Sequence, residues 1–406
     1  MEAVFSLPFL ILSRREAGLL LLLFLTEFAR GAFFFTFLPS WIVNYLGFSV
    51  TVVGFAVSAQ YLTETLFKTF AGWQFDRLGR PVLIGGLGLS FLSLLALKHW
   101  PVTAAMIVFA GLFGLGFSPL WLGVISRVAP LEASRRGTRI SMVFASWLAG
   151  AGSGMVSANF LMVRDYETVF KLVLLLWALS FLIAWFSSGP AAGLEDQKIS
   201  AGNGHGAWKA LKRMATNKIM TRLLFPGIFF QTLAAGLLLP VLPLFAQQHL
   251  QLNHSQYGTM LLAGGAAAVL FLPPMGHLAD RFSLKYLLGL GFGFSGLMLG
   301  FFTCSQKAAE AYLLAVLLGI SYAMILPAWN SLVARIIPPE SQAAGWGVFA
   351  TIEGLGITAG PALGGIAARL IGMPGTLLTT TAVLLAASLF YFFYPVESIL
   401  AKEQGG

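Results

Sequence analysis

The chain has 406 residues, of which 57% are hydrophobic and only 10% are charged. A soluble domain carries roughly 25% charged residues, so this composition excludes a disordered chain and argues against a soluble enzyme. The single cysteine, Cys304, excludes a disulfide framework and a cysteine-based metal site. The remaining class is an all-α membrane protein that crosses the bilayer many times.

Apolar runs separated by charged or Pro/Gly breaks predict the membrane spans, because one membrane helix needs roughly 20 mostly apolar residues. The N-terminal stretch Ala3–Leu12 is apolar but too short to cross, and we interpret it as an interfacial segment rather than a signal peptide. The sequence predicts twelve transmembrane helices, at residues 17–38, 50–72, 82–97, 102–126, 138–163, 168–187, 222–246, 256–277, 284–304, 310–333, 343–368 and 375–394.

The net charge of +9 follows the membrane topology rather than a nucleic-acid surface. Most of the 25 Lys and Arg residues fall in the connections that share a side with the N-terminus. Such a bias marks the cytoplasmic side of a membrane protein. We therefore expect both termini to be cytoplasmic, the basic loops to lie against membrane lipids, and no nucleic-acid partner.

The chain contains an internal repeat. The stretch Gly72-Trp-Gln-Phe-Asp76-Arg77-Leu-Gly79-Arg80-Pro81 follows the second predicted span. The stretch Gly276-His-Leu-Ala-Asp280-Arg281 follows the eighth, and its Gly, Asp and Arg each lie 204 residues after their counterparts. Repeats of this kind predict two structurally similar halves. We expect an N-terminal six-helix bundle at 1–187, a cytoplasmic linker at 188–221 and a C-terminal six-helix bundle at 222–406.

The repeated loop motif resembles that of the major facilitator superfamily. The resemblance implies a secondary transporter with two six-helix bundles and a substrate site at their interface. Fixed charges and close-packing glycine at helix ends suit a cytoplasmic gate. On this basis we assign gating roles to Gly72, Asp76, Arg77, Arg80, Asp280 and Arg281.

Ionisable residues inside the first two spans are candidates for substrate and proton handling, because a charge in a span is costly unless it is paired or wet. Glu27 and Arg30 stand three residues apart on one face of the first span. Gln60, Glu64 and Lys68 follow one another at helical spacing in the second. The alternative is a neutralising pair that only stabilises packing.

The equivalent face of the second half is almost entirely apolar. At the repeat offset Glu27 becomes Gln231, and Glu64 becomes Ala268. A small polar solute would not need a binding site with one apolar side. A lipid with a sugar headgroup would fit such a site, because its headgroup can contact the polar half of the protein and its acyl chains can contact the apolar half.

A finer resemblance supports this interpretation. Within the superfamily, the chain resembles the flippases that move the glycolipid anchor of lipoteichoic acid; the strings that carry it are Leu25-Thr-Glu-Phe-Ala-Arg-Gly31, Ser118-Pro-Leu-Trp121, Ser146-Trp147, Leu224-Phe-Pro-Gly-Ile228, Leu326-Pro-Ala-Trp-Asn330 and Trp346-Gly-Val-Phe349. It implies a bacterial plasma-membrane protein that moves diglucosyl-diacylglycerol from the inner to the outer leaflet by proton antiport. The proton gradient then replaces any cofactor, and a glycolipid synthase and a lipoteichoic acid synthase are implied partners.

The resemblance also implies site residues, with Trp121 and Trp147 offering faces on which a sugar can stack. The substrate and proton site predicted in this way comprises Glu27, Arg30, Glu64, Lys68, Trp121, Trp147 and Asn330. One departure is Glu64, because the related flippases carry aspartate at that position.

Two other functions remain open. An exporter of amphipathic drugs would use the same carboxylates and apolar half, and an intramembrane enzyme acting on lipid-linked sugar would use Glu27 and Glu64 as a catalytic pair. The six-plus-six repeat has no purpose in such an enzyme. No phosphate-binding loop or hydrolase motif is present in the sequence, and His249 and His254 have no nearby carboxylate to complete a metal site.

Overall fold

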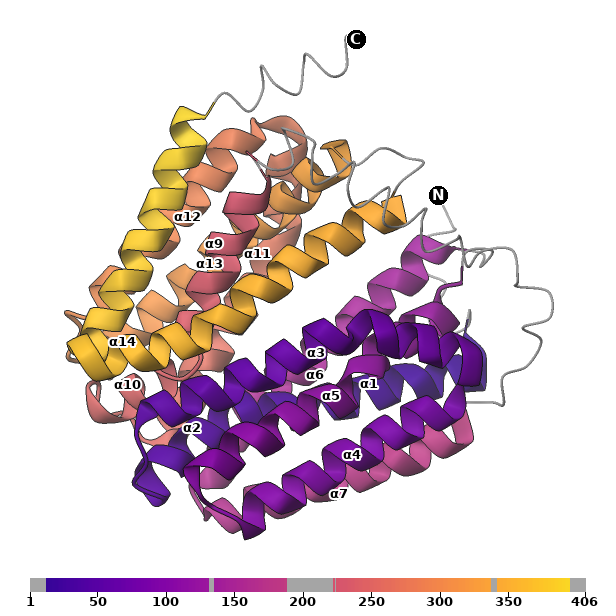
Figure 1. The fold of residues 1–406 in the computed structure, drawn as a ribbon. Coiled ribbons are helices and arrows are strands. Elements are labelled where there is room, and N and C mark those ends of the chain that lie inside the picture. The colour runs from indigo at the N-terminus through magenta and orange to yellow at the C-terminus, as the bar shows by residue number, and fades with distance from the viewer. Residues whose placement is uncertain (1–11, 131–134, 188–221, 223, 337–341, 395–406) are drawn as a thin grey trace. The chain divides into compact units, whose positions relative to one another are not determined.

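The computed structural model describes residues 12–130, 135–187, 222, 224–336 and 342–394 (Figure 1). Their secondary structure is helical, and no strand occurs among these described ranges. Ten helices within them are long and apolar enough to cross a membrane, and the bent pair α9–α10 supplies another crossing. One of the ten, Thr351–Phe393, is long enough for two crossings, since Gly372 interrupts it with φ 76° and ψ 170°. The twelve crossings expected from the sequence are therefore present.

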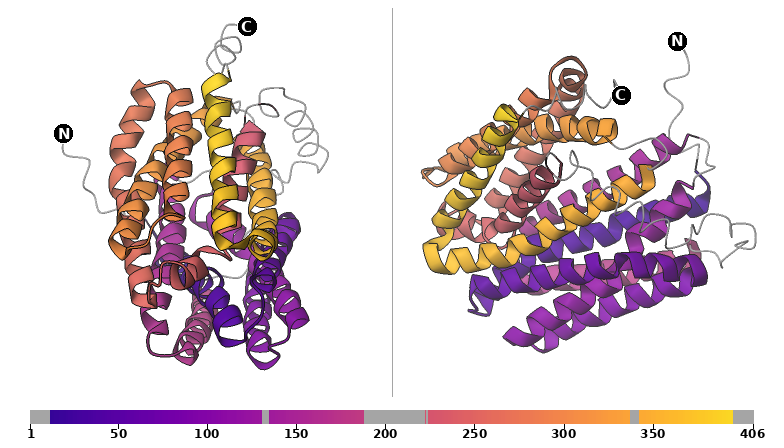
Figure 2. Two further views of the ribbon diagram at one scale, coloured as in Figure 1. Left: turned by 90° about the vertical axis from the view of Figure 1, so that its left-hand side faces the viewer. Right: turned by 45° about the horizontal axis from the view of Figure 1, so that its top comes forward.

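The first compact unit takes in Met1–Phe48 and Ala59–Asp196. Its α4 and α7 run side by side, as Figures 1 and 2 both show, and Trp177 Nε1 on α7 donates a hydrogen bond of 2.9 Å to the Leu87 carbonyl on α4. The helices that contribute to this unit are α1 (Arg14–Ala32), η2 (Phe33–Phe37), α2 (Leu38–Ser40), η3 (Trp41–Tyr45), α3 (Val50–Leu78), α4 (Arg80–His99), α5 (Thr103–Val128), α6 (Arg136–Met162) and α7 (Tyr166–Ser187).

The first span is longer than predicted. Helical structure continues to Tyr45, whereas the expected span ended at residue 38. The expected end lies just before Pro39, which lacks an N–H and so favours a break in a regular helix. The wider π-helical turns η2 and η3 flank it and carry the helix past the proline.

The second compact unit takes in Ser49–Ser58 and Gln197–Gly406, so it includes the first turns of α3. The predicted linker at 188–221 and the N-terminal segment Ala3–Leu12 lie outside the described residues, apart from Leu12 itself. The other helices of this unit are α9 (Phe225–Leu238), α10 (Leu242–Gln248), α11 (His254–Arg281), α12 (Leu284–Phe302), α13 (Ala308–Ile336) and α14 (Gln342–Phe393).

The seventh span is bent rather than straight. The expected continuous helix at 222–246 is divided into α9 and α10, whose axes differ by 40°. Pro240 lies in the break and Pro243 lies in the first turn of α10. Neither proline can donate the backbone hydrogen bond that would continue a regular helix across this point.

A serine of α3 enters the hydrogen-bond ladder of α14 within the second unit. The Ser58 hydroxyl donates to the Thr358 carbonyl at 2.6 Å and accepts from the Ala362 N–H at 2.8 Å. In a regular α-helix that carbonyl and that N–H bond to each other. The insertion lies beside Pro361, which itself has no N–H to donate.

Glycines set the close packing of several helix pairs. A Cβ on Gly150 of α6 would lie 2.5 Å from the Phe24 carbonyl oxygen and 3.1 Å from Glu27 Cβ on α1. In the second unit, a Cβ on Gly236 of α9 would lie 2.8 Å from Gly360 Cα on α14. The small size of glycine permits these approaches, and the first of them brings α6 directly against the charged face of α1.

Candidate functional site

Two helices of the first unit present the intramembrane charges predicted from the sequence. The fourth and fifth turns of α1 carry Glu27 and Arg30, and the middle of α3 carries Glu64 and Lys68. Glu27 and Arg30 are 2% and 4% exposed, so both are desolvated by the surrounding helices. The structure brings all four side chains together.

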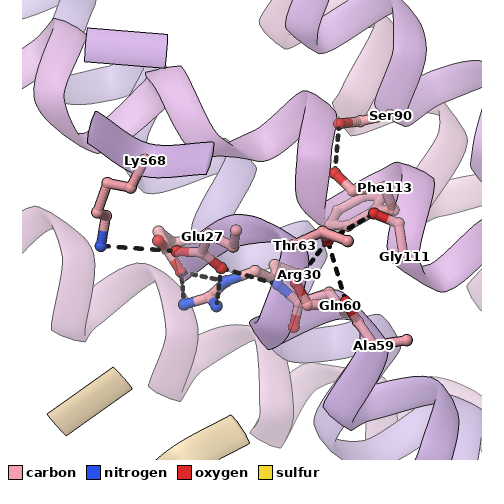
Figure 3. A network of polar contacts seen from close by, with 10 residues as sticks. Glu27, Arg30, Ala59, Gln60, Thr63, Lys68, Ser90, Gly111 and Phe113 are labelled. Carbon is pink, nitrogen blue, oxygen red and sulfur yellow. Dashed lines mark hydrogen bonds and ion pairs between the residues drawn. The ribbon is translucent and has the colours of Figure 1, made fainter. Parts of the chain in front are cut away.

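The four side chains form a chain of ion pairs (Figure 3). Arg30 Nη2 lies 2.7 Å from Glu27 Oε2, and its Nη1 lies 3.6 Å from Glu64 Oε2. Lys68 Nζ lies 3.9 Å from Glu64 Oε1. Gln60, one turn before Glu64, donates from Nε2 to Glu64 Oε2 at 2.8 Å. Arg30 therefore links a carboxylate on its own helix to one on α3.

Aromatic rings enclose the Arg30 guanidinium. Its central carbon lies 5.5 Å from the ring centre of Phe35, 5.7 Å from that of Tyr61 and 5.0 Å from that of Phe117. Ring faces attract a cation and hold it away from water. Sequence reasoning missed these three residues, because nothing distinguishes them among the 36 Phe and 9 Tyr of the chain.

The charges of this network balance, with two carboxylates against two cations. Removing one partner of a buried ion pair typically costs about 3–5 kcal/mol, because the other charge is left uncompensated. Balance alone would also suit a purely structural role. The network differs from a fully satisfied pair in that Arg30 Nη1 and Gln60 Oε1 are buried and lack hydrogen-bond partners among the described residues. Each such group costs about 1–3 kcal/mol when it stays unpaired, so these two atoms are candidates for contact with a polar ligand.

The two tryptophans predicted to stack on sugar lie together. The ring centres of Trp121 on α5 and Trp147 on α6 are 6.1 Å apart, at an angle of 75°. Phe144, which the sequence did not single out, packs edge-on against both, at 5.1 Å and 6.4 Å, and is 49% exposed. Gly150, one turn after Trp147, contacts the helix face that carries Glu27. Gly150 therefore brings α6, the helix that carries Phe144 and Trp147, against the helix that carries Glu27.

Asn330 belongs to the other compact unit. It lies on α13, on the exposed side of that helix. Its neighbour Trp329 is buried and packs edge-on against Tyr391 at 6.0 Å. The four charged residues thus form one network and the two tryptophans form another contact, both within the first unit, whereas Asn330 is described with the second unit alone.

The predicted gating residues of the first half include two arginines that stack on tryptophan. Arg77 lies 4.4 Å from the ring centre of Trp73, and Arg80 lies 3.9 Å from that of Trp185. Gly72 allows α5 to approach, since a Cβ there would lie 2.7 Å from Leu122 Cδ1. The Asp76 side chain lies outside the described part of the structure. In the second half, the corresponding Asp280 and Arg281 are exposed at the end of α11.

An ion pair at the N-terminal end of α1 was not foreseen. Arg139 on α6 pairs with Glu16, and its Nη1 also donates to the Val128 carbonyl at the end of α5 at 2.9 Å. Glu16 is also the reciprocal partner of Ser13 in the capping box that begins α1. Capping-box spacing in the sequence could have identified Glu16, but not its partner 123 residues away.

The described residues hold no group of three or more His, Cys, Asp or Glu side chains that could bind a metal ion. The chemistry that the site offers is therefore that of ionisable carboxylates, two cations, an amide and aromatic faces. Such a set can bind a polar, uncharged group and exchange a proton.

Curated proteins similar to this chain include flippases. The chain is 28% identical over 382 residues to the "proton-coupled antiporter flippase LtaA" of Staphylococcus aureus, a match that covers 93% of both chains. Relatives with the same name from other strains, USA300 among them, match to the same extent.

Solved structures support the fold. The nucleoside transporter NupG superposes with a TM-score of 0.73 at 17% identity, covering 94% of this chain and 100% of NupG. The human organic anion transporter MFSD10 gives a TM-score of 0.61 at 18% identity, covering 93% and 99%. At such identities the likeness extends to the fold alone.

A family model described as "Major Facilitator Superfamily" matches residues 19–225 and again residues 224–406. The two successive matches agree with the internal repeat of the sequence. The resulting function is that of a secondary transporter and not of an enzyme. The chain belongs to the major facilitator superfamily.

Proposed function

We propose that this transporter is a proton-coupled antiport flippase. Its substrate is a glycolipid, the diglucosyl-diacylglycerol anchor of lipoteichoic acid, which it moves from the inner to the outer leaflet of a bacterial plasma membrane. The similarity to the proton-coupled antiporter flippase LtaA, over 93% of both chains, supports lipid flipping coupled to proton antiport. Both termini are cytoplasmic in this proposal, in keeping with the distribution of Lys and Arg.

The observation that carries the proposal is the buried network of Glu27, Arg30, Glu64 and Lys68. Glu27 and Arg30 are almost fully buried inside a membrane-spanning bundle. Such residues mark substrate or proton pathways in transporters. The neighbouring cluster of Trp121, Phe144 and Trp147 supplies aromatic faces that suit a sugar ring.

Proton and headgroup compete for the same carboxylates in the proposed cycle. A sugar hydroxyl donates a stronger hydrogen bond to an ionised carboxylate than to a protonated one. Headgroup binding on the inner side therefore expels a proton from Glu27 or Glu64, and a proton taken up from the outer side weakens headgroup binding. This reciprocal linkage couples lipid export to proton entry without ATP.

The two halves divide the substrate in this proposal. The first half binds the headgroup through its charged residues. The second half offers apolar residues to the acyl chains, including Ala234 on α9 and Ala268 on α11, which stand where the first half has Arg30 and Glu64. Asn330 is the polar contribution expected from the second half.

Gating is assigned to the repeated loop motif. Asp76 acts with Arg77, Arg80 and Gly72 in the first half, and Asp280 acts with Arg281 in the second. By resemblance, a glycolipid synthase supplies the substrate and a lipoteichoic acid synthase uses the product, and both are proposed partners.

A second candidate is the export of amphipathic drugs. The exposure of Phe144 next to Trp121 favours it, since an open aromatic cluster also accepts planar apolar compounds. Reconstitution into liposomes with a panel of fluorescent lipids and drugs separates the two. Gain of glycolipid in the outer leaflet without ATP, with no transport of the drugs, supports the flippase, whereas transport of drugs alone contradicts it.

A further inference from the structure

The Arg30 guanidinium has one nitrogen that the protein leaves without a hydrogen bond. Nε and Nη2 both donate to the same oxygen, Glu27 Oε2, at 2.9 Å and 2.7 Å. Nη1 is buried, lies 3.6 Å from Glu64 Oε2 and has no hydrogen-bond partner among the residues described. Three aromatic rings pack around the guanidinium, and Nη1 is the guanidinium nitrogen that is buried without a hydrogen bond among the described residues.

Gln60 has the complementary deficit. Its side chain is fully buried, with 0% exposure. Nε2 donates to Glu64 Oε2, which fixes the direction of the amide because an ionised carboxylate accepts only from the N–H side. Oε1 consequently points away from Glu64 and has no hydrogen-bond donor within the described part of the chain.

The two unpaired atoms belong to one neighbourhood. Arg30 Nη1 and Gln60 Nε2 both approach the same oxygen of Glu64, at 3.6 Å and 2.8 Å. Figure 3 shows the guanidinium of Arg30 and the amide of Gln60 next to each other. A buried donor, Arg30 Nη1, and a buried acceptor, Gln60 Oε1, therefore lie in the same part of the site.

A hydroxyl group fits this pair, because it accepts one hydrogen bond and donates another. The oxygen of a phosphodiester only accepts, so it would satisfy Arg30 and leave Gln60 Oε1 unpaired. Charge gives the same preference: the two carboxylates and two cations of the network already balance, and a phosphate would add an uncompensated negative charge.

We infer that Arg30 Nη1 and Gln60 Oε1 form a subsite for one hydroxyl of the headgroup, and that Gln60 selects an uncharged sugar over a phosphate. The inference rests on the proposed flippase function and specifies which headgroup chemistry the site accepts. Gln60 contacts the substrate in this arrangement and also positions Glu64.

The test compares two lipids with identical acyl chains, a fluorescent diglucosyl-diacylglycerol and a fluorescent phosphatidylethanol, whose anionic phosphodiester headgroup has no hydroxyl, in proteoliposomes of the full chain. Gln60→Met keeps the length of the side chain and removes both amide groups. Gln231→Met is the matched control, because Gln231 on α9 also has a buried, unpaired Oε1 but lies in the apolar half. Size-exclusion chromatography checks the folding of each variant. If Gln60→Met misfolds, Gln60→Asn replaces it, because the asparagine side chain is one methylene too short for its amide to reach the headgroup hydroxyl.

We expect the wild type to move the glycolipid at least tenfold faster than phosphatidylethanol. Gln60→Met should lose about tenfold in the glycolipid rate and little in the phosphatidylethanol rate, while Gln231→Met matches the wild type. Equal wild-type rates for the two lipids, or a Gln60→Met glycolipid rate equal to that of Gln231→Met, would overturn the inference and leave the flippase function intact. A wild type that moves neither lipid would instead overturn the proposed function, and the inference with it.

Discussion

At the residue scale, the central feature of the proposed site is the buried ion pair between Glu27 and Arg30. The pair makes two short contacts to a single carboxylate oxygen, and both residues are almost without exposure. A buried charge is tolerated mainly through its partner, so each residue should be more damaging to remove alone than together with the other.

We therefore expect Arg30→Gln to lower the free energy of unfolding by about 3–5 kcal/mol, because Glu27 is left as an uncompensated buried charge. The double variant Glu27→Gln with Arg30→Gln should regain part of this loss, since both charges are then absent. Thermal melting of the purified proteins in detergent measures both. A double variant no more stable than Arg30→Gln would show that the pair is not energetically coupled.

Sequence spacing anticipated part of this site. The separation of three residues placed Glu27 beside Arg30, and the separation of four placed Gln60 and Lys68 beside Glu64, because these spacings bring side chains together on a helix. The contact between Arg30 and Glu64 joins two helices, so it could be identified only from the tertiary structure. The enclosure of Arg30 by Phe35, Tyr61 and Phe117 could not be predicted for the same reason.

At the element scale, the contact between α1 and α6 connects packing to the site. The glycines of α6 permit a close approach to α1, and Gly150 meets the turn that carries Glu27. The sequence did not predict the π-helical continuation of the first span beyond Pro39, since a proline in the sequence indicates a break more often than a bulge.

Gly150→Ala should destabilise the protein, because its new methyl group would lie 2.5 Å from the Phe24 carbonyl oxygen. Gly152→Ala is the matched control on the same helix, as a Cβ there would meet nothing within 4 Å. The control should be neutral or gain about 0.5–1 kcal/mol from the better helix propensity of alanine. Melting temperatures that fall equally in both variants would contradict this account of the α1–α6 contact.

The cytoplasmic gate is also an element-scale prediction. Asp76→Asn removes the charge at the end of α3 and keeps the shape of the side chain, so we expect slower transport with headgroup binding little changed. Asp165→Asn, in the connection between α6 and α7, tests the same substitution away from the repeated motif. Cysteines introduced at both membrane faces of a Cys304→Ser variant, and labelled with a thiol reagent, measure how accessible each face of the transporter is to water. Unchanged transport together with unchanged labelling in Asp76→Asn would remove the gate assignment.

At the scale of the whole molecule, the two halves share one fold and differ in chemistry. The superfamily model matches each half separately, which the Gly-Asp-Arg repeat had indicated from the sequence. The positions of Arg30 and Glu64 in the first half correspond to alanines in the second. A duplicated scaffold with one polar and one apolar half suits a substrate that is itself polar at one end and apolar at the other.

Ala268→Glu tests the division of the substrate between the halves. A carboxylate among the acyl chains should block glycolipid movement, since burying an unpaired charge costs about 2.5–3.5 kcal/mol or more in a membrane. Ala268→Gln adds nearly the same volume without the charge and should retain more activity. If Ala268→Glu folds and flips glycolipid at the wild-type rate, the second half does not bind the acyl chains.

The central claim is that Glu27, Arg30 and Glu64 form one site that couples a proton to a headgroup. The most direct test is the initial rate of glycolipid movement against an imposed pH gradient, measured in proteoliposomes for the wild type, Glu27→Gln, Glu64→Gln and Arg30→Ala. We expect the wild-type rate to rise with the gradient, Glu64→Gln to lose this response because its side chain cannot ionise, and Arg30→Ala to lose both response and rate. Retention of the wild-type response by all three variants would contradict proton coupling at this site.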